Sequence, residues 1–342
     1  MRILVQRFSA LGDIAILLPI LQALKEEYPQ HDFAFCSRPY LRPLAEGIGL
    51  RFFAADLQSK HKGFLGLRKL ANEIYNDFQP DVVIDSHAVL RTQLLNKFYA
   101  FKGAKVYGID KDRKGRKQFL ETKNAEQFAL KAISEIHLNT FKAAGLKSNF
   151  NRTSVNKAPF KLKADTEKWW QSKAGAINIG IAPGARHRSK QWPKEKFVQF
   201  LKAHQSSDYH FFLFGGPDEI PFLNEIGESA DANFHLAAGL FPLDQEIALM
   251  AQNQIFISND SSNMHLAAWS GTKVISLWGG THPAAGFAPY NNLNNMLSLP
   301  DDALNCRPCS IYGRSTCSRG DWACLEDLSV QALNQKVAAL LA

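Results

Sequence analysis

The sequence has 342 residues, of which 46% are hydrophobic and 21% charged, with a formal net charge of +8. This length and composition exclude an intrinsically disordered chain and predict two globular domains of about 150–170 residues each. No apolar run approaches the roughly 20 residues that cross a bilayer, and no small-residue cleavage site follows the apolar stretch after Asp13, so we expect a cytoplasmic protein.

The first half of the chain alternates short apolar runs with helical patterns. Residues 2–8 predict a strand, which a small-residue turn and then apolar residues at helical spacing from Ile14 to Leu24 follow. This alternation is typical of a mostly parallel sheet that helices cover on both faces. Further strands are predicted over 33–36, 82–84 and 105–109, and helices over 64–78, 92–101 and 126–144.

The second half repeats the pattern after a polar, lysine-rich stretch over residues 149–176, and we place the domain boundary near residue 160. The sequence predicts an α/β protein with two doubly wound domains, 1–160 and 161–325, and a terminal segment, 326–342, whose helix could cross back to the first domain. Strands are predicted over 177–182, 210–214, 234–236, 255–258 and 273–278, and helices over 194–203, 218–228, 244–251, 264–269 and 330–341.

Loops at the carboxyl ends of the strands are the candidate sites, because open α/β sheets bind their ligands there. Asp13 follows the first predicted strand and opens a helix. A carboxylate in that position is commonly an N-cap worth about 1 kcal/mol. It could also take a proton from an incoming hydroxyl group, so both interpretations stay open.

Two loops of the second half combine glycine with charge. In the loop 183–193, Arg186, Arg188 and Lys190 supply the cations that a diphosphate leaving group needs where no metal is bound. After the next strand, Glu219 follows two glycines and could accept hydrogen bonds from ribose hydroxyls. The alternative for this second loop is helix capping by Asp218.

The clearest local signal for a ligand is the run of short polar residues from 259 to 263. Ser261 and Ser262 open a predicted helix, whose unpaired N–H groups attract anions. Asp260 beside them could bind sugar hydroxyls. His265, one helical turn further, could reach the same anion or be a buried structural histidine.

Gly280 and Thr281 follow the next strand and offer a second close approach of backbone to ligand. The motifs of several other enzyme classes are missing from the strand ends. No GxGxxG, GxxxxGK[ST], HExxH or GxSxG pattern occurs at a suitable position. This argues against a dinucleotide oxidoreductase, a P-loop NTPase, a zinc protease and a serine hydrolase.

The positive charge lies in the first half, because residues 1–160 hold 25 Lys and Arg against 15 Asp and Glu. Eight of the basic residues, Lys111, Arg113, Lys114 and Lys123 among them, lie within 102–123. Such a stretch suits a phosphorylated glycolipid, a membrane surface or nucleic acid, or is a solvated loop. No nucleic-acid-binding pattern accompanies it, so we expect no nucleic-acid partner.

Four cysteines, Cys306, Cys309, Cys317 and Cys324, lie close together near the C-terminus. In a cytosolic protein this spacing favours a structural zinc site, with disulfides or free thiols as alternatives.

In their order along nearly the whole chain, these motifs resemble the ADP-heptose:lipopolysaccharide heptosyltransferases, glycosyltransferase family 9. One departure is that Ser262 and Asn263 stand where the family usually has glycine and a variable residue. The matching pieces are Leu11-Gly12-Asp13, Pro183-Gly184 with Lys190-x-Trp192-Pro193, Gly215-Gly216-Pro217-x-Glu219, and Asp260-Ser261-x-x-x-His265 followed by Gly279.

The resemblance implies a GT-B fold, in which two Rossmann-like domains face a central cleft, and sugar transfer with inversion and without a divalent metal or other cofactor. It implies that Asp13 is the general base. The nucleotide-sugar site would comprise Lys190, Glu219, Asp260, Ser261, Ser262, His265, Gly280 and Thr281. We expect the acceptor at Arg7, Ser9, Lys111, Arg113 and Lys114.

The expected activity is transfer of a heptose-like sugar from a nucleoside diphosphate, ADP-heptose being favoured, to lipopolysaccharide core or a related glycolipid. Peripheral contact with the inner membrane would accompany such an acceptor. The alternatives are a GT-B transferase or an epimerase that uses another nucleotide sugar, and a non-catalytic protein that binds nucleotide sugars.

Overall fold

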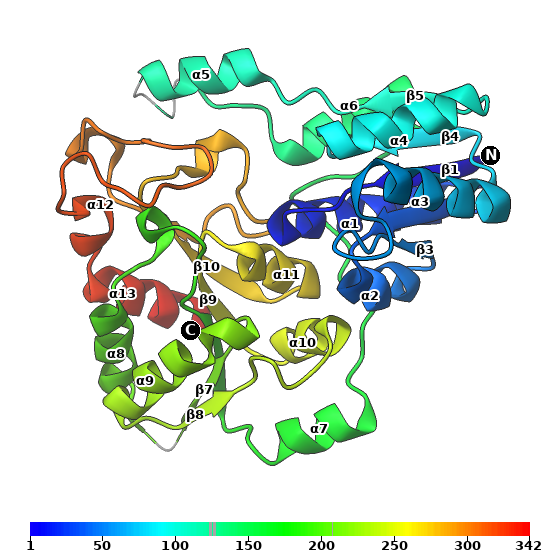
Figure 1. The fold of residues 1–342 in the computed structure, drawn as a ribbon. Helices are drawn as coiled ribbons and strands as arrows, with labels where there is room; N and C mark the ends of the chain where they lie inside the picture. The colour runs from blue at the N-terminus through cyan, green and yellow to red at the C-terminus, as the bar shows by residue number, and fades with distance from the viewer. Residues whose placement is uncertain (123–124, 126–127, 207) are drawn as a thin grey trace. The chain divides into compact units, whose positions relative to one another are not determined.

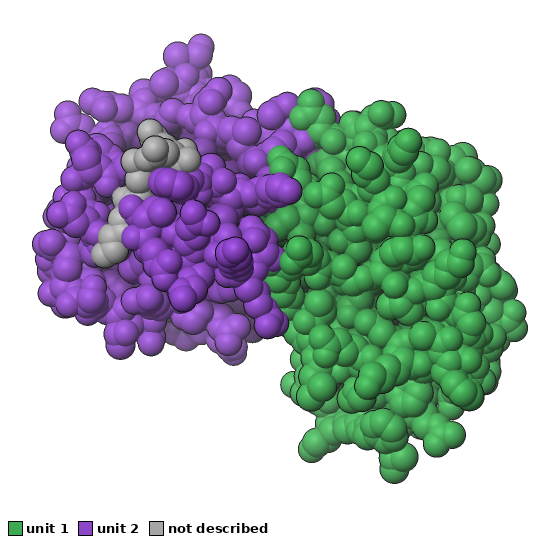
Figure 2. Space-filling model, turned by 90° about the horizontal axis from the view of Figure 1, so that it is seen from above, with its two compact units in different colours: residues 1–111, 133–151 green, residues 112–132, 152–342 purple. Residues whose placement is uncertain are grey.

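The computed structural model describes residues 1–342 except 123–124, 126–127 and 207. The chain forms two compact units, coloured separately in Figure 2. Unit 1 comprises Met1–Lys111 and Ile133–Asn151, and unit 2 comprises Asp112–Ala132 and Arg152–Ala342. Among the described residues, no helix combines the length and the apolar character that a membrane span requires.

Unit 1 is built on a parallel sheet with the strand order β3-β2-β1-β4-β5 in the described residues (Figure 1). The central strand β1 is buried almost throughout, as expected of a parallel strand with both faces covered. The strands are β1 Arg2–Gln6, β2 Asp32–Ser37, β3 Arg51–Ala54, β4 Val82–Asp85 and β5 Lys105–Gly108.

Two pairs of helices cover this sheet. Helices α3 (Gly63–Phe78) and α4 (Leu90–Phe101) contact each other and pack on the face that presents Leu4 and Val83. Helices α1 (Leu11–Glu27) and α6 (Ile133–Ala143) form the second pair. Because side chains alternate along a strand, Ile3 and Val5 point to the other face, which α1 and α6 cover. A short helix, α2 (Arg42–Gly47), precedes β3.

Unit 2 is built on a second parallel sheet, with the order β11-β10-β9-β6-β7-β8 in the part of the chain described. Most of the strands are short and rich in branched or aromatic residues, which favour the extended conformation. They are β6 Ile177–Ala182, β7 Tyr209–Leu213, β8 Phe234–Leu236, β9 Ile255–Asn259, β10 Lys273–Leu277 and β11 Met296–Leu297.

Helices of unit 2 follow these strands in the doubly wound manner that the sequence predicts. The last helix, α13 (Val330–Leu341), contacts α8, β9 and β10, and its Leu333 and Val337 are part of the core of unit 2. The others are α7 Ala164–Gln171, α8 Lys194–Ala203, α9 Ile220–Ala230, α10 Leu243–Met250, α11 Ser262–Ser270 and α12 Ala323–Glu326. The terminal segment thus packs within unit 2, where its apolar residues are buried.

The basic stretch after β5 differs most from the expectation. Residues 113–122 form helix α5 (Arg113–Thr122), which belongs to unit 2 although the sequence on both sides of 112–132 belongs to unit 1. The cause is burial of Phe119 against Ala285 and Ile311. The division between the units at Asn151 and Arg152 also precedes the expected boundary near residue 160. Lys123 and the expected helix start at 126 lie outside the described residues.

Glu246, in the first turn of α10, makes the stability of the folded protein depend on pH. Burial raises the pKa of its carboxyl group to about 7. Between pH 4.5 and 7 the unfolded chain loses this proton while the folded protein keeps it, so the folded state loses stability as the pH rises, and above pH 7 the loss is complete. We therefore expect Glu246→Gln to be more stable than the wild type by about 1–2 kcal/mol at pH 8, and equally stable at pH 4.

Urea unfolding at the two pH values measures this difference. Glu228→Gln is the matched control, because Glu228 is an exposed carboxylate on α9. Equal stability of Glu246→Gln and wild type at pH 8 would contradict the expectation.

Candidate functional site

Asp13 lies at the carboxyl edge of the unit 1 sheet, in the first turn of α1. The N-cap of that helix is Ala10, and no side chain caps it, so capping does not explain Asp13. Instead, the Oδ2 atom of Asp13 lies 2.5 Å from Nη2 of Arg7, and the Asp13 side chain is 22% exposed. The carboxylate is thus held in place and still reachable from solvent.

Arg7 holds Asp13 rather than extending toward solvent. The residue is 7% exposed, and its other terminal nitrogen, Nη1, donates to the backbone carbonyl of Ser86. The guanidinium therefore ties the loop after β1 to the loop after β4. The expected direct contact of Arg7 with an acceptor stays a prediction, since each terminal nitrogen keeps a second N–H group.

His87, in the loop after β4, completes the surroundings of Asp13 and was missed by the sequence prediction. Its Nε2 lies 3.2 Å from Oγ of the exposed Ser9, and the backbone N–H of His87 donates to Oδ1 of Asp85 at 3.0 Å. Burial, together with the charges of Arg7 and Lys111, lowers the His87 pKa to about 4. The imidazole is therefore neutral at pH 7. The strand-end rule would have identified this loop, had it been applied to the run 82–84.

A second histidine, His137 of α6, is fully buried, and neither ring nitrogen has a hydrogen-bond partner among the described residues. Burial lowers its pKa to about 3, with a further contribution from the charge of Arg7. No strand-end pattern marks this residue, since it lies in the middle of a helix.

In unit 2 the predicted residues gather at the carboxyl ends of four neighbouring strands, β10, β9, β6 and β7. Nζ of Lys190 lies 2.8 Å from Oδ2 of Asp260, with side-chain exposures of 15% and 6%. The hydroxyl of Thr281 donates to the same oxygen at 2.7 Å. Three residues far apart in the sequence thus form one largely buried network.

Asn259 places the loop that carries Lys190. Its Nδ2 donates to the carbonyl of Pro183 at 2.6 Å, and its Oδ1 accepts from the N–H of Trp192 at 3.2 Å. Asn259 is fully buried, so these bonds fix both ends of the loop to β9. The sequence prediction included Asn259 only as part of a polar run.

The start of α11 has the features of an anion-binding site. Ser261 is the N-cap, but its side chain makes no capping hydrogen bond and its Oγ lies 3.3 Å from Oγ of Ser258. The first-turn N–H groups, Ser262 among them, are therefore not satisfied by a side-chain cap and lie at the positive end of the helix dipole. His265 is buried on the same helix.

Glu219 lies against two of the glycines. A Cβ atom on Gly184 would lie 1.7 Å from Oε1 of Glu219, and one on Gly215 would lie 2.8 Å from Oε2. The Oε2 atom also accepts from the N–H of Gly216 at 2.8 Å. Glu219, rather than Asp218, therefore caps this turn, while its carboxylate spans the loops after β6 and β7.

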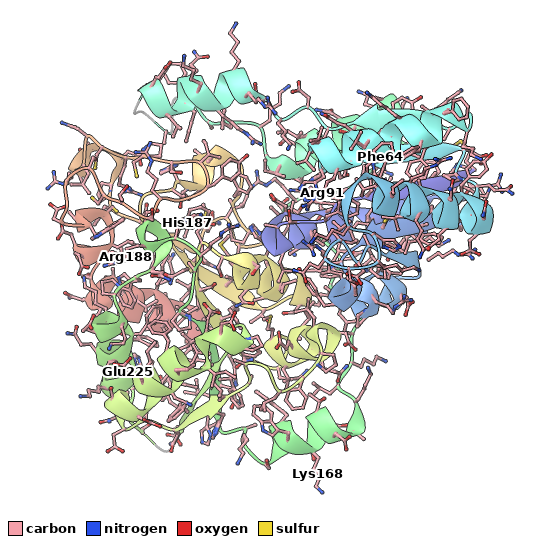
Figure 3. All side chains as sticks on the ribbon, in the orientation of Figure 1. Phe64, Arg91, Lys168, His187, Arg188 and Glu225 are labelled. Atoms are coloured by element: carbon pink, nitrogen blue, oxygen red, sulfur yellow. The ribbon has the colours of Figure 1, made fainter. Side chains whose placement is uncertain are left out.

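At this edge of the sheet, the contacts of two residues differ from those expected from the sequence. The backbone N–H of Gly280 donates to the carbonyl of Ser189 and its carbonyl accepts from Cys309, so neither backbone group is left for a ligand. Arg188, labelled in Figure 3, pairs with Glu326 at 2.8 Å rather than adding to the charge near Lys190.

The cysteine-rich segment is hydrogen-bonded to the loops at the carboxyl edge of the unit 2 sheet. The Nε of Arg307 donates to the carbonyl of Gly279 at 2.8 Å, and the N–H of Arg314 donates to Oγ of Ser189 at 2.7 Å. These bonds connect the segment to the loops after β10 and β6, and Arg307 is 3% exposed.

The structural zinc predicted at Cys306, Cys309, Cys317 and Cys324 stays a prediction. All four are free thiols, and within the described residues no three Cys, His, Asp or Glu side chains are placed to hold a metal ion. The four thiols are close enough to interact electrostatically, although their immediate surroundings differ. The Cys309 thiol donates to the carbonyl of Gly280, whereas Cys324 is buried in the core of unit 2.

The expected acceptor residues are divided between the units. Lys111 lies in unit 1, where its Nζ donates to the carbonyl of Ala88 at 3.3 Å. Arg113 and Lys114 are exposed on α5 in unit 2. The sequence stretch therefore does not form one patch on one unit.

Comparison with known proteins supports a single family. The profile described as glycosyltransferase family 9 (heptosyltransferase) matches residues 68–315. The lipopolysaccharide core heptosyltransferase OpsX of Haemophilus influenzae is 24% identical over 308 residues, which cover 86% of this chain and 84% of that protein.

Solved structures show the same fold. The glycosyl transferase family 9 protein of Veillonella parvula superposes with a TM-score of 0.80 at 20% identity, covering 99% of this chain and 97% of that one. The E. coli ADP-heptose lps heptosyltransferase II has a TM-score of 0.71 at 19% identity, covering 100% and 98%.

Proposed function

This chain belongs to glycosyltransferase family 9 and is a glycosyltransferase of the GT-B fold, and from that premise we propose that it transfers heptose from ADP-heptose to a lipopolysaccharide core acceptor. Inversion at the anomeric carbon is part of the proposal. The observation that carries it is the Lys190–Asp260–Thr281 network beside the uncapped start of α11.

Unit 2 is assigned the nucleotide sugar. The diphosphate accepts hydrogen bonds from the first-turn N–H groups of α11 and from the ammonium of Lys190, which replace a divalent metal in neutralising the leaving group. Asp260 holds that ammonium in place and accepts from sugar hydroxyls. Glu219, which spans the loops after β6 and β7, accepts from the ribose hydroxyls.

Unit 1 is assigned the acceptor and the base. The Asp13 carboxylate removes the proton from the acceptor hydroxyl as its oxygen forms a bond to the anomeric carbon. The bond from that carbon to the diphosphate oxygen breaks, and ADP leaves with the electron pair. Arg7 orients the carboxylate, and the exposed Ser9 with neutral His87 offers hydrogen bonds to acceptor hydroxyls.

The place of action follows from the acceptor. Lipopolysaccharide core is built on a lipid, so the proposal places the enzyme in the cytoplasm at the inner-membrane surface.

Release of ADP tests the proposal. We expect ADP release from ADP-heptose only when a core acceptor is present, and a product in which the anomeric configuration is inverted relative to the donor. Mass spectrometry of the acceptor and NMR of the new linkage provide the readouts. Equal release without acceptor, or isomerisation of the donor sugar without transfer, would refute the proposal and favour another nucleotide-sugar activity.

A further inference from the structure

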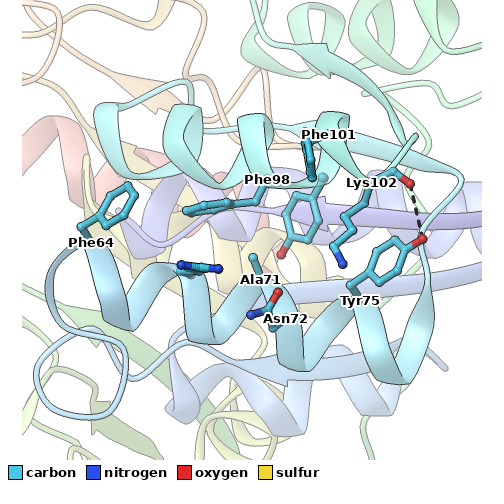
Figure 4. A pocket seen from close by; sticks show the side chains of 9 residues that line it. Phe64, Ala71, Asn72, Tyr75, Phe98, Phe101 and Lys102 are labelled. Carbon is cyan, nitrogen blue, oxygen red and sulfur yellow. Dashed lines mark hydrogen bonds between the residues drawn. The ribbon is translucent and has the colours of Figure 1, made fainter.

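A groove of about 480 Å³ lies between α3 and α4 of unit 1 (Figure 4). Aromatic side chains form much of its wall, with Phe64 and Tyr75 on α3 and Phe98 on α4. The rings of Phe64 and Phe98 lie 5.7 Å apart. The mechanism above uses none of these residues.

Two cations line the same groove. Lys102 places its ammonium 5.0 Å from the centre of the Tyr75 ring, and Arg68 lies on α3. Neither forms an ion pair with a carboxylate among the described residues. An anion in the groove would therefore meet uncompensated positive charge.

The charge around the groove has one sign. Residues 86–109, which include the whole of α4, contain four Lys and Arg and no Asp or Glu. The two acids of α3 are neutralised by neighbours, Glu73 by Lys60 at 2.9 Å and Asp77 by Arg51 at 2.5 Å. The net charge of this face is positive.

Large apolar side chains project from the same two helices. Phe64 and Leu65 on α3 are 56% and 75% exposed, and Leu90 and Phe101 on α4 are 73% and 90% exposed. Exposed aromatic and aliphatic residues beside Lys and Arg are characteristic of surfaces that enter the headgroup region of a membrane. A soluble anion would use the cations but not these apolar groups.

Tyr99 of α4 lies at the bottom of the groove. Its side chain is fully buried and lines the groove, and its hydroxyl has no hydrogen-bond partner among the described residues. The hydroxyl is shielded from solvent and interacts with the buried Cys36 of β2, so it faces the core of unit 1 and is closed to a ligand in the groove.

From these features we infer that the α3–α4 groove is a membrane-docking site that takes the phosphate headgroup of an anionic phospholipid. Arg68 and Lys102 meet the phosphate, and Phe64, Leu65, Leu90 and Phe101 enter the bilayer surface. The inference does not depend on which sugar is transferred.

Vesicle co-sedimentation with the full chain tests the inference. We expect binding to vesicles rich in phosphatidylglycerol and none to pure phosphatidylcholine, with the bound fraction falling as salt rises. R68E/K102E should lower the partition coefficient at least about twenty-five-fold, at about fivefold for each of the two cations lost. F64S/F101S should lower it at least about tenfold.

The control is K168E/K202E, which changes the net charge equally at exposed lysines of α7 and α8 in unit 2 and should bind as the wild type does. Wild-type binding by R68E/K102E, or an equal loss in the control, would overturn the site. Y99F, whose hydroxyl faces the core, should bind as the wild type does.

If the protein binds to vesicles only when a second protein is present, the inference is overturned in favour of a protein partner. Transfer to an acceptor stripped of its lipid should be equal in R68E/K102E and wild type. If neither the wild type nor any variant transfers the sugar, while vesicle binding follows the expected pattern, the proposed function is refuted and the docking site is not.

Discussion

Replacing Asp13 by asparagine should lower kcat at least about a hundredfold, because general-base catalysis commonly contributes a factor of about 10²–10⁴. The amide keeps the shape of the side chain and can still accept the hydrogen bond from Arg7, but it cannot take a proton. ADP binding should stay at the wild-type level, since unit 2 is assigned the nucleotide sugar. Steady-state kinetics and calorimetry with ADP measure the two quantities.

Burial of Arg7 requires a check on folding in this variant. The Arg7 side chain is 9% exposed, and Asp13→Asn removes its charged partner. A lower Tm is therefore expected, and kinetics should be measured well below it.

Asp81→Asn is the matched control. Asp81 also accepts a hydrogen bond from an arginine residue, the backbone N–H of Arg2, but it precedes β4 at the amino edge of the same sheet. We expect its turnover to be unchanged. Near-normal turnover of Asp13→Asn would exclude Asp13 as the base.

Lys190→Ala should weaken ADP binding by about ten- to a hundredfold, corresponding to a charge-assisted hydrogen bond of about 1.5–3 kcal/mol. Loss of the ammonium also leaves Asp260, 6% exposed, without its cation. That carboxylate would then repel the diphosphate. This repulsion adds to the loss of the hydrogen bond, so the weakening of ADP binding should lie toward the upper end of that range.

A double-mutant cycle separates the two contributions. We expect Asp260→Asn to keep ADP affinity near the wild-type level, because Lys190 stays, and the double variant to bind more tightly than Lys190→Ala, because the repulsion is gone. Calorimetry with ADP provides all four values. Lys194→Ala, which breaks the exposed pair with Glu225, is the control and should bind normally. Wild-type affinity in Lys190→Ala would exclude Lys190 from the phosphate site.

The order of strands and helices could be predicted from the sequence because it rests on local patterns. The apolar runs 177–182 and 255–258 predicted β6 and β9, and the helical spacing after Ile14 predicted α1. The strand-end rule then pointed to Asp13, Lys190 and Asp260, since in parallel sheets such loops share one edge.

Only the tertiary structure decided how these residues are paired. The sequence could not show that Lys190 contacts Asp260, that Arg188 pairs with Glu326, or that α5 packs in unit 2, because each contact joins segments distant in the chain. Such contacts depend on strand order and on side-chain burial, which emerge when the whole core assembles. Local spacing thus determined where polar groups leave the sheets, and long-range packing determined which of those groups meet.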